Sequence, residues 1–248
     1  LLLNSYGYVS NKFLSKAAFD WERFRSDTMV AQRLMDDLID LELESIDKIL
    51  DKIKNDPEPE NIKYVETEMW KRFRKNCTLG RRTGLGLTAI ADTLAGLGIR
   101  YDSSDAVEFV NKLYTELCVS TYASSVQLAK ERGAFPMFSH AVEQDNPFLK
   151  RVWSLDKNLE EEYLKHGRRN VACLTTAPCG SVSLLAQTSS GIEPVFRLSY
   201  TRRKKINTDD KSEKVDFIDE LGDRWQEFEV YHKGLQTWMD VTGKTDIK

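Results

Sequence analysis

The sequence predicts an α/β fold in which helices predominate. Long segments near residues 20–55, 103–132 and 215–240 space their apolar residues at the intervals of a helix. Two short apolar runs, Val171–Thr176 and Val195–Tyr200, have the length and composition of strands. Strands that alternate with long helices favour an α/β architecture over a helical bundle.

The first predicted helix covers Asp20–Asn55, and the prolines of the following Asn55–Asn61 segment end it. A shorter helix is expected over Tyr64–Arg74, followed by a turn at Gly80. The next segment is expected to be helical up to Gly98, and its apolar face is made of four residues: Leu87, Ile90, Ala91 and Leu94.

A second long helix is expected to begin at Ser103–Asp105 and to end at Gly133. Ala134–Phe138 should be extended, and Asn158–Lys165 should form a charged helix that stops at Gly167. The last predicted helix, Val215–Asp240, rests on the spacing of four apolar residues: Phe217, Leu221, Trp225 and Phe228.

Composition limits the function classes. The 248 residues carry a formal net charge of −3, with 41% hydrophobic and 30% charged residues, as in ordinary globular proteins. No apolar run approaches the ~18–20 residues of a membrane-spanning helix, and the acidic balance argues against nucleic-acid binding despite the basic run at Arg202–Lys205. Four cysteines without a CxxC pair predict neither a disulfide framework nor a zinc site, and they fit a reducing cytoplasm.

The segment Gly167–Tyr200 contains the strongest candidate site. It reads as a strand, a turn of small residues that Pro178 begins, and a helix that Ser181 opens. Gly180 permits a close approach of a ligand to the backbone. Free N–H groups at the positive end of a helix attract anions, although an ordinary strand–helix connection has the same pattern.

The sequence of this segment, GRRNVACLTTAPCGSVSLLAQTSSGIEPVF, resembles a segment of adenosylcobalamin-dependent (class II) ribonucleotide reductases. The resemblance continues in Gln32–Glu42, Arg81–Tyr101, Ala129–Phe138 and Asn146–Leu149, in the same order. In that family an A-P-T-G-T loop holds the substrate phosphates on backbone amides. The resemblance therefore assigns substrate phosphate binding to five residues: Pro178, Cys179, Gly180, Ser181 and Val182. Cys179 and Ser181 stand where the family has threonine.

The resemblance implies a ten-stranded α/β barrel, of which residues 1–248 would be roughly the second half, with a basic polar loop insertion at 200–214. It implies reduction of ribonucleoside di- or triphosphates by a thiyl radical that adenosylcobalamin initiates. The implied partners are the ribonucleotide, a thioredoxin- or glutaredoxin-type reductant and a second copy in a homodimer, in the cytoplasm. Glu193 and Pro194, in the GIEP block, would line the barrel.

The family's Asn-x-Cys-x-Glu motif and its C-terminal cysteine pair are absent from these 248 residues. We therefore expect an internal piece of a longer chain, with no catalytic residue and no metal ligand of its own, and inactive in isolation. A class I large subunit, a glycyl-radical enzyme and a non-catalytic nucleotide- or phosphate-binding module are the alternatives.

Two other patterns have simpler interpretations. Gly84, Gly86 and Ala89 match the G-x-G-x-x-A dinucleotide fingerprint, but a basic segment instead of an apolar strand precedes them, so close packing at the glycines is favoured. The acids of residues 36–44 lack the Glu-x-x-His pairs of a di-iron site, and most should be solvated. Asp36 and Asp40 share a helical face, which leaves an inward pairing with an arginine open.

Overall fold

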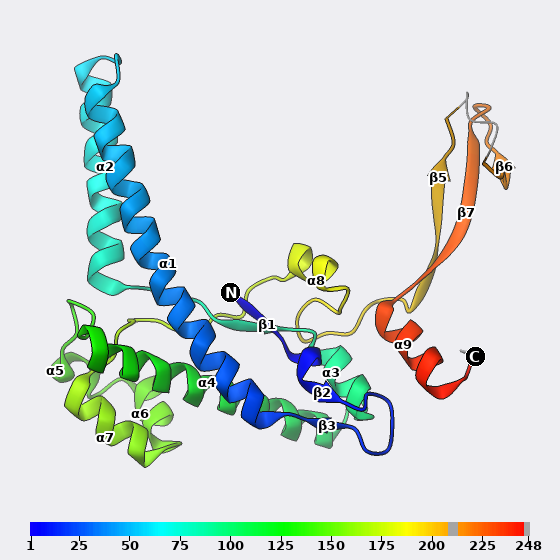
Figure 1. Cartoon of the computed structure of the whole chain (residues 1–248), viewed down its shortest axis with the longest axis horizontal. Coiled ribbons are helices and arrows are strands. Elements are labelled where there is room, and N and C mark those ends of the chain that lie inside the picture. The colour runs from blue at the N-terminus through cyan, green and yellow to red at the C-terminus, as the bar shows by residue number, and fades with distance from the viewer. Residues whose placement is uncertain (208–212, 246–248) are drawn as a thin grey trace. The chain divides into compact units, whose positions relative to one another are not determined.

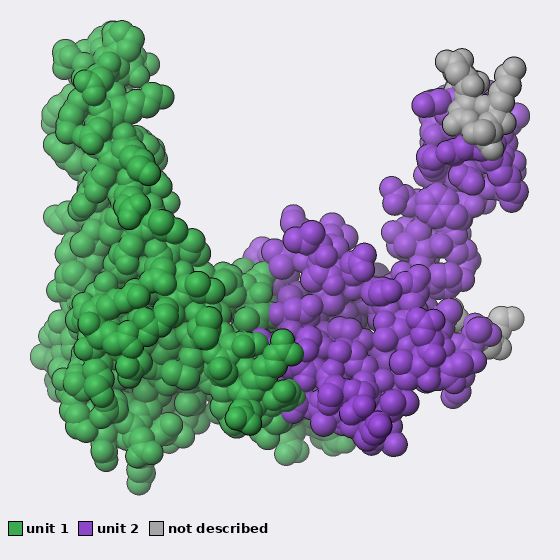
Figure 2. Space-filling model, viewed as in Figure 1, with its two compact units in different colours: residues 1–3, 20–87, 102–177 green, residues 4–19, 88–101, 178–248 purple. Residues whose placement is uncertain are grey.

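A computed structural model describes residues 1–207 and 213–245. The chain divides into two compact units (Figure 2). Unit 1 comprises residues 1–3, 20–87 and 102–177, and unit 2 comprises residues 4–19, 88–101 and 178–248. We describe each unit separately.

Two antiparallel helices, α1 (Trp21–Asn55) and α2 (Glu60–Gly80), form a long hairpin in unit 1 (Figure 1). The Asp20 carboxylate caps α1 by accepting a hydrogen bond from the Arg23 amide at 3.0 Å. Both ends of α1 agree with the prediction, whereas α2 is longer than the predicted Tyr64–Arg74. No residue of α2 is fully buried, and this weak burial explains why its ends were poorly marked in the pattern.

The second long helix, α4 (Ser104–Arg132), confirms the predicted signals at both ends. Ser103 caps its start by accepting from the Ala106 amide at 3.2 Å, and Gly133 ends it with a φ of 85°, a conformation that favours glycine. Three shorter helices follow: α5 (His140–Glu143), α6 (Pro147–Ser154) and α7 (Lys157–His166). Of these, only α7 was predicted.

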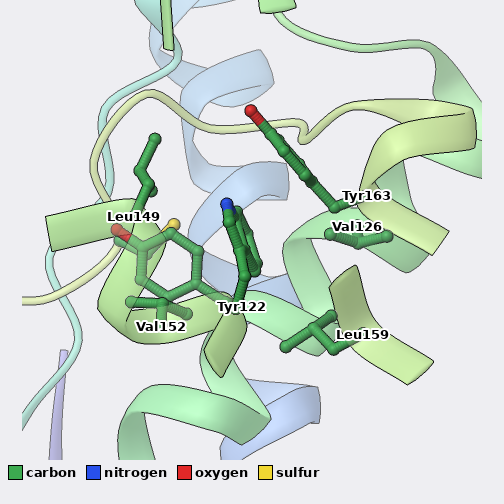
Figure 3. Packing of buried hydrophobic residues seen from close by; sticks show 8 residues of the cluster. Tyr122, Val126, Leu149, Val152, Leu159 and Tyr163 are labelled. Carbon is green, nitrogen blue, oxygen red and sulfur yellow. The ribbon is translucent and has the colours of Figure 1, made fainter. Parts of the chain in front are cut away.

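One apolar core cluster of unit 1 lies between α4, α6 and α7 (Figure 3). Tyr163 stacks on Trp153 with ring centroids 4.2 Å apart, and Tyr122 meets Trp153 edge-on at 5.7 Å. Aromatic pairs in these arrangements add to the stability that burial itself gives. The other members of the cluster are Val126, Leu149, Val152, Leu159 and Cys173. The interpretation of Cys173 as a core residue is confirmed.

Unit 2 contains short elements from three parts of the chain. They are η1 (Ser5–Tyr8), β2 (Val9–Ser10), β3 (Ala18–Phe19), α3 (Ile90–Leu97), α8 (Gly180–Ala186), β5 (Ser199–Lys205), β6 (Phe217–Ile218), β7 (Arg224–Tyr231) and α9 (Lys233–Thr242). Gly98 ends α3 in the left-handed region, at a φ of 74°, as predicted.

The described residues form no closed barrel. Their strands make three small sheets: β1 (Leu2–Asn4) with β4 (Gly86–Thr88), β2 with β3, and the order β5-β7-β6. The helix-rich character of the fold is confirmed. The predicted strand Val171–Thr176 is wrong: this segment forms no strand, and only Leu174 makes an isolated parallel bridge, to Leu85.

The predicted helix Val215–Asp240 is wrong. Residues 217–231 form β6, a turn at Gly222 and β7, and only α9 is helical in this range. The aromatic spacing that suggested a helix instead serves cross-strand packing, since Trp225 stacks on Phe217 with centroids 6.3 Å apart. Aromatic pairs across strands stabilise a sheet, and a local helical pattern cannot reveal them.

The basic stretch at 200–214 is not a loop throughout. Residues 200–205 belong to β5, whose predicted range Val195–Tyr200 lies too early, and residues 208–212 fall outside the described residues. The basic side chains pair with acids of the same sheet region: Arg203 with Glu227, Lys204 with Glu213, and Lys205 with Asp223. These pairs neutralise three of the positive charges of the run.

Within the described ranges, no helix combines the length and the apolar character needed to cross a membrane.

Candidate functional site

The segment before the candidate loop is held by backbone hydrogen bonds inside unit 1. The Thr83 amide donates to the Ala172 carbonyl at 2.9 Å and the Leu85 amide to the Cys173 carbonyl at 2.8 Å. The Thr175 amide returns a bond to the Leu85 carbonyl at 3.0 Å. This short parallel ladder fixes the register of residues 172–175.

The two glycines of the G-x-G-x-x-A pattern allow this ladder to form. A Cβ atom added to Gly86 would lie 2.4 Å from the Thr175 carbonyl oxygen, and one on Gly84 would lie 3.1 Å from the Thr175 methyl group. The interpretation of these glycines as close-packing residues is confirmed, although they approach an extended segment and not a helix.

The candidate phosphate loop, residues 178–182, leads into α8 in unit 2. The helix begins at Gly180, and Cys179 is its N-cap residue with no side-chain capping bond, so the expectation that Ser181 caps the helix is wrong. Cys179 is buried, whereas Pro178, Gly180, Ser181 and Val182 are exposed. Because the first N–H groups of a helix lack acceptors within it, the exposed turn can offer amides to an anion.

Glu193 and Pro194 lie in the wall of a cavity of ≈710 Å³ in unit 2. The same cavity is lined by Ser183 of α8, by Gln187 just after it, and by residues of β5 and β7, among them Tyr200 and Tyr231. Glu193 is exposed. The structure thus brings the GIEP block and α8 to one cavity.

A buried polar network in unit 1 unites three of the blocks that carry the family resemblance. Asn170 donates its side-chain amide to Asp36 Oδ1 at 2.9 Å, and Arg81 Nε donates to the same oxygen at 2.8 Å. Gln32 Nε2 and Ser125 Oγ both donate to Asn170 Oδ1 at 2.9 Å. Every donor and acceptor of the Asn170 side chain is thereby used, because its amide also donates to the carbonyl of Arg81 at 3.1 Å.

The acids of α1 form ion pairs in this network. The carboxylates of Asp36, Asp37 and Asp40 have oxygens within 4.8 Å of one another. Arg81 pairs with Asp36 and with Asp40, each at 2.8 Å, which confirms the inward pairing that the shared helical face left open. Arg132 pairs with Asp37 at 2.6 Å, so guanidinium groups supply the neutralising charge that a metal ion would otherwise bring.

A second polar cluster, in unit 2, was not predicted. Asp92 on α3 meets His232, with His232 Nε2 at 3.0 Å from Oδ1, and accepts a bond from the Ser189 amide at 2.8 Å. These residues are separated by 97 and 140 positions in the chain. Such distances leave no local signal in the sequence.

Burial raises the pKa of two thiols of unit 1. It raises the pKa of the Cys173 thiol to about 12 and that of Cys118 to about 11, so both stay protonated near neutral pH. A protonated thiol is neither a nucleophile nor a metal ligand.

The described residues do not by themselves form a cobalamin site. Two cavities among the described residues of unit 2 have volumes of ≈710 and ≈420 Å³, which suit ordinary small ligands. Adenosylcobalamin carries a corrin macrocycle, a nucleotide tail and an adenosyl group, and it is much larger than such ligands. We therefore assign no residue of this chain to that cofactor.

Comparison with known proteins identifies the family. The family model described as "Ribonucleotide reductase, barrel domain" matches residues 8–238. The chain belongs to this family.

Curated relatives carry names that agree with it. A vitamin B12-dependent ribonucleoside-diphosphate reductase of Mycobacterium tuberculosis is 30% identical over 77% of this chain and 21% of its own length. A protein of the same name from Thermoplasma acidophilum is 27% identical over 92% of this chain and 24% of its own. The chain thus spans between a fifth and a quarter of the length of these relatives.

Relatives of other names also match. The ribonucleoside-diphosphate reductase subunit alpha of Treponema pallidum is 27% identical over 50% of this chain and 15% of its own length. Among solved structures, the class Id ribonucleotide reductase alpha subunit of Actinobacillus ureae covers 49% of this chain and 19% of its own, at 24% identity and a TM-score of 0.36.

Proposed function

We propose that this chain serves ribonucleotide reduction as part of the barrel domain of a ribonucleoside-diphosphate or -triphosphate reductase. The match of residues 8–238 to the barrel-domain family is the observation that carries this proposal. In the reaction a hydrogen replaces the 2′-hydroxyl of the ribose, water leaves, and a dithiol is oxidised to a disulfide.

The contribution of this chain would be to hold the substrate phosphates at Pro178, Cys179, Gly180, Ser181 and Val182. The exposed first turn of α8 supports this role, as does the resemblance of the APCGS loop to the family's phosphate loop. Backbone amides do the binding there, so the presence of Cys179 and Ser181 in place of threonine leaves the main contacts available. Glu193 and Pro194 would shape the adjacent wall.

Adenosylcobalamin is the cofactor that we propose for the full-length enzyme, because relatives that match most of this chain are named vitamin B12-dependent. The proposed partners are the ribonucleotide, a thioredoxin- or glutaredoxin-type dithiol reductant and a second copy of the enzyme. The cytoplasm would supply both the nucleotides and the reductant.

The phosphate loop is tested by titrating the chain with cytidine diphosphate in a calorimeter. A Cβ added at Gly180 meets no atom within 4 Å, so Gly180→Val adds a branched side chain beside the amides without a clash at its Cβ. We expect at least tenfold weaker binding for Gly180→Val. Gly7→Val is the matched control, since Gly7 also has open space around it, and it should bind like the unchanged chain.

Two further measurements test whether the loop binds phosphate. Inorganic phosphate should compete with the nucleotide if the loop binds phosphate, and Cys179→Thr should bind at least as tightly as the unchanged chain. Binding without turnover is expected for the 248 residues alone. Turnover by this purified chain with adenosylcobalamin and a dithiol would contradict the expectation that it holds no catalytic cysteine.

A further inference from the structure

Ser189 lies three residues beyond the end of α8 and is fastened to the start of α3 through each of its polar groups. Its amide donates to Asp92 Oδ2 at 2.8 Å, and its hydroxyl oxygen accepts from the Asp92 amide at 3.4 Å. Its carbonyl accepts from the Ala89 amide and from the Thr88 hydroxyl, both at 3.2 Å. Ser189 is 1% exposed, so these bonds form without competition from water.

Asp92 extends the attachment to a third segment. Both of its oxygens lie near His232 Nε2, at 3.0 and 3.1 Å. A carboxylate only accepts hydrogen bonds, so the Nε2–H group of the imidazole donates to it. His232 is the N-cap residue of α9, and its own amide donates to the Leu198 carbonyl at 2.8 Å.

One carboxylate therefore joins α3, the segment after α8 and the start of α9, all inside unit 2. Thr188, Ser190 and His232 are also wall residues of the ≈710 Å³ cavity that Glu193 lines. Gly234 adds to the fit, because a Cβ there would lie 3.2 Å from the His232 ring.

We call the hydrogen bonds that Asp92 makes with Ser189 and His232 the Asp92 clamp. The helix that precedes Ser189, α8, is short. α8 has seven residues and spans about 10 Å at 1.5 Å per residue, with the candidate phosphate loop at one end and Ser189 just beyond the other. Its side chains Leu184 and Leu185 are 81% and 88% exposed, so packing of these residues contributes little to its placement. Its N-cap residue Cys179 and its Ser183 are buried, and the hydrogen bonds at Ser189 restrain the segment that follows its C-terminal end.

We propose that Asp92 is a positioning residue for the phosphate loop: through Ser189 it fixes α8, and through His232 it fixes the α9 wall of the same cavity. The inference rests on the proposed function, because it concerns the loop that would bind the substrate phosphates. Asp92 acts through hydrogen bonds in this role and touches no substrate. His232 acts only on the cavity wall.

The test compares Asp92→Ala with the conservative Asp92→Asn. The asparagine keeps an acceptor for Ser189 and the alanine does not. We expect about tenfold weaker cytidine diphosphate binding for Asp92→Ala, the factor that the loss of one buried hydrogen-bond partner typically gives, and within about threefold of the unchanged chain for Asp92→Asn. Asp240→Ala removes the same charge from an exposed position on α9 and should have no effect.

A second variant guards against a general loss of folding. His232→Ala releases α9 but leaves the Asp92–Ser189 bond, so it should weaken binding less than Asp92→Ala does. Circular dichroism establishes that each variant is folded. Equal affinity of Asp92→Ala and the unchanged chain would overturn the positioning role.

Hydrogen exchange separates this inference from the proposed function. The amides of Ser189 and Ala89 should exchange at least tenfold faster in Asp92→Ala, whether or not a nucleotide is present. If the unchanged chain binds no nucleotide, the proposed phosphate loop fails, while the exchange rates still decide whether the clamp exists. Unchanged exchange at both amides would rule out the clamp.

Discussion

Asn170 and Asp36 are 134 positions apart in the chain, yet the Asn170 side chain donates a hydrogen bond of 2.9 Å to Asp36, and both residues are fully buried. Asn170 belongs to the GRRN block and Asp36 to the α1 block that resemble the same family. Their contact joins the helical hairpin of unit 1 to the segment that precedes the phosphate loop. A buried amide with all its bonds made restricts the alternatives that the chain can adopt at this point.

Replacing Asn170 by aspartate should destabilise the chain by about 3 kcal/mol. The substitution removes the donor that serves Asp36 and brings a second carboxylate next to it in a buried site. Urea unfolding measured at pH 7 checks this value. Asn158→Asp on the exposed start of α7 is the matched control and should change the unfolding free energy by less than about 0.5 kcal/mol.

The Asp36 carboxylate should make the stability of the chain depend on pH in acid. Burial alone would raise the pKa of Asp36, but the hydrogen bonds and charges of Arg81, Asn170 and Arg169 outweigh it and leave the pKa below its ordinary value. A depressed pKa stabilises the folded state above the unfolded value of about 3.9, and this contribution is lost as the pH falls through the folded pKa.

Unfolding free energies of the unchanged chain and of Asp36→Asn between pH 7 and pH 2.5 test this statement. The gap between the two should be constant above about pH 5 and should shrink below about pH 4. Asp51→Asn, at an exposed position on α1, serves as the control. A gap that widens in acid would show that the carboxylate is not stabilised in the folded state.

Gly86→Ala should destabilise unit 1 by about 2 kcal/mol, because the added Cβ would lie 2.4 Å from the backbone oxygen of Thr175 and neither segment can move aside without breaking the ladder. Thermal unfolding measures the effect. Gly7→Ala, with no atom within 4 Å, is the control. If Gly86→Ala were as stable as this control, the ladder would not be as close as the structure describes.

The accuracy of the sequence-based predictions followed the range of the interactions. α1 and α4 were predicted with their ends because their signals are local: a capping carboxylate at Asp20, a capping hydroxyl at Ser103 and a glycine at Gly133. The arginine partner of Asp36 and Asp40 was left open by the shared helical face. Its identity as Arg81 required the fold.

The errors arose where distant residues decide the structure. β7 pairs along its length with β5, and the side chain of Trp225 packs on Phe217, so neither strand is stable without its partner. The spacing of the apolar residues in the same segment matched the pattern of a helix. The contact between Asp92 and His232 was missed for the same reason, because it depends on the packing of segments that are 140 residues apart.

The native chain should protect the thiols of Cys118 and Cys173 from an aromatic disulfide reagent at pH 8. Burial raises their pKa values to about 11 and about 12, so almost no thiolate is present, and the reagent has no access to the fully buried Cys173. The half-buried Cys77 should react first.

The measurement counts the thiols that react with the reagent over time, before and after denaturant is added. Cys77→Ser should remove the fast phase. A fast phase that persists in Cys77→Ser and disappears in Cys173→Ser would mean that the core around α4, α6 and α7 opens readily, contrary to the packing of Trp153 on Tyr163.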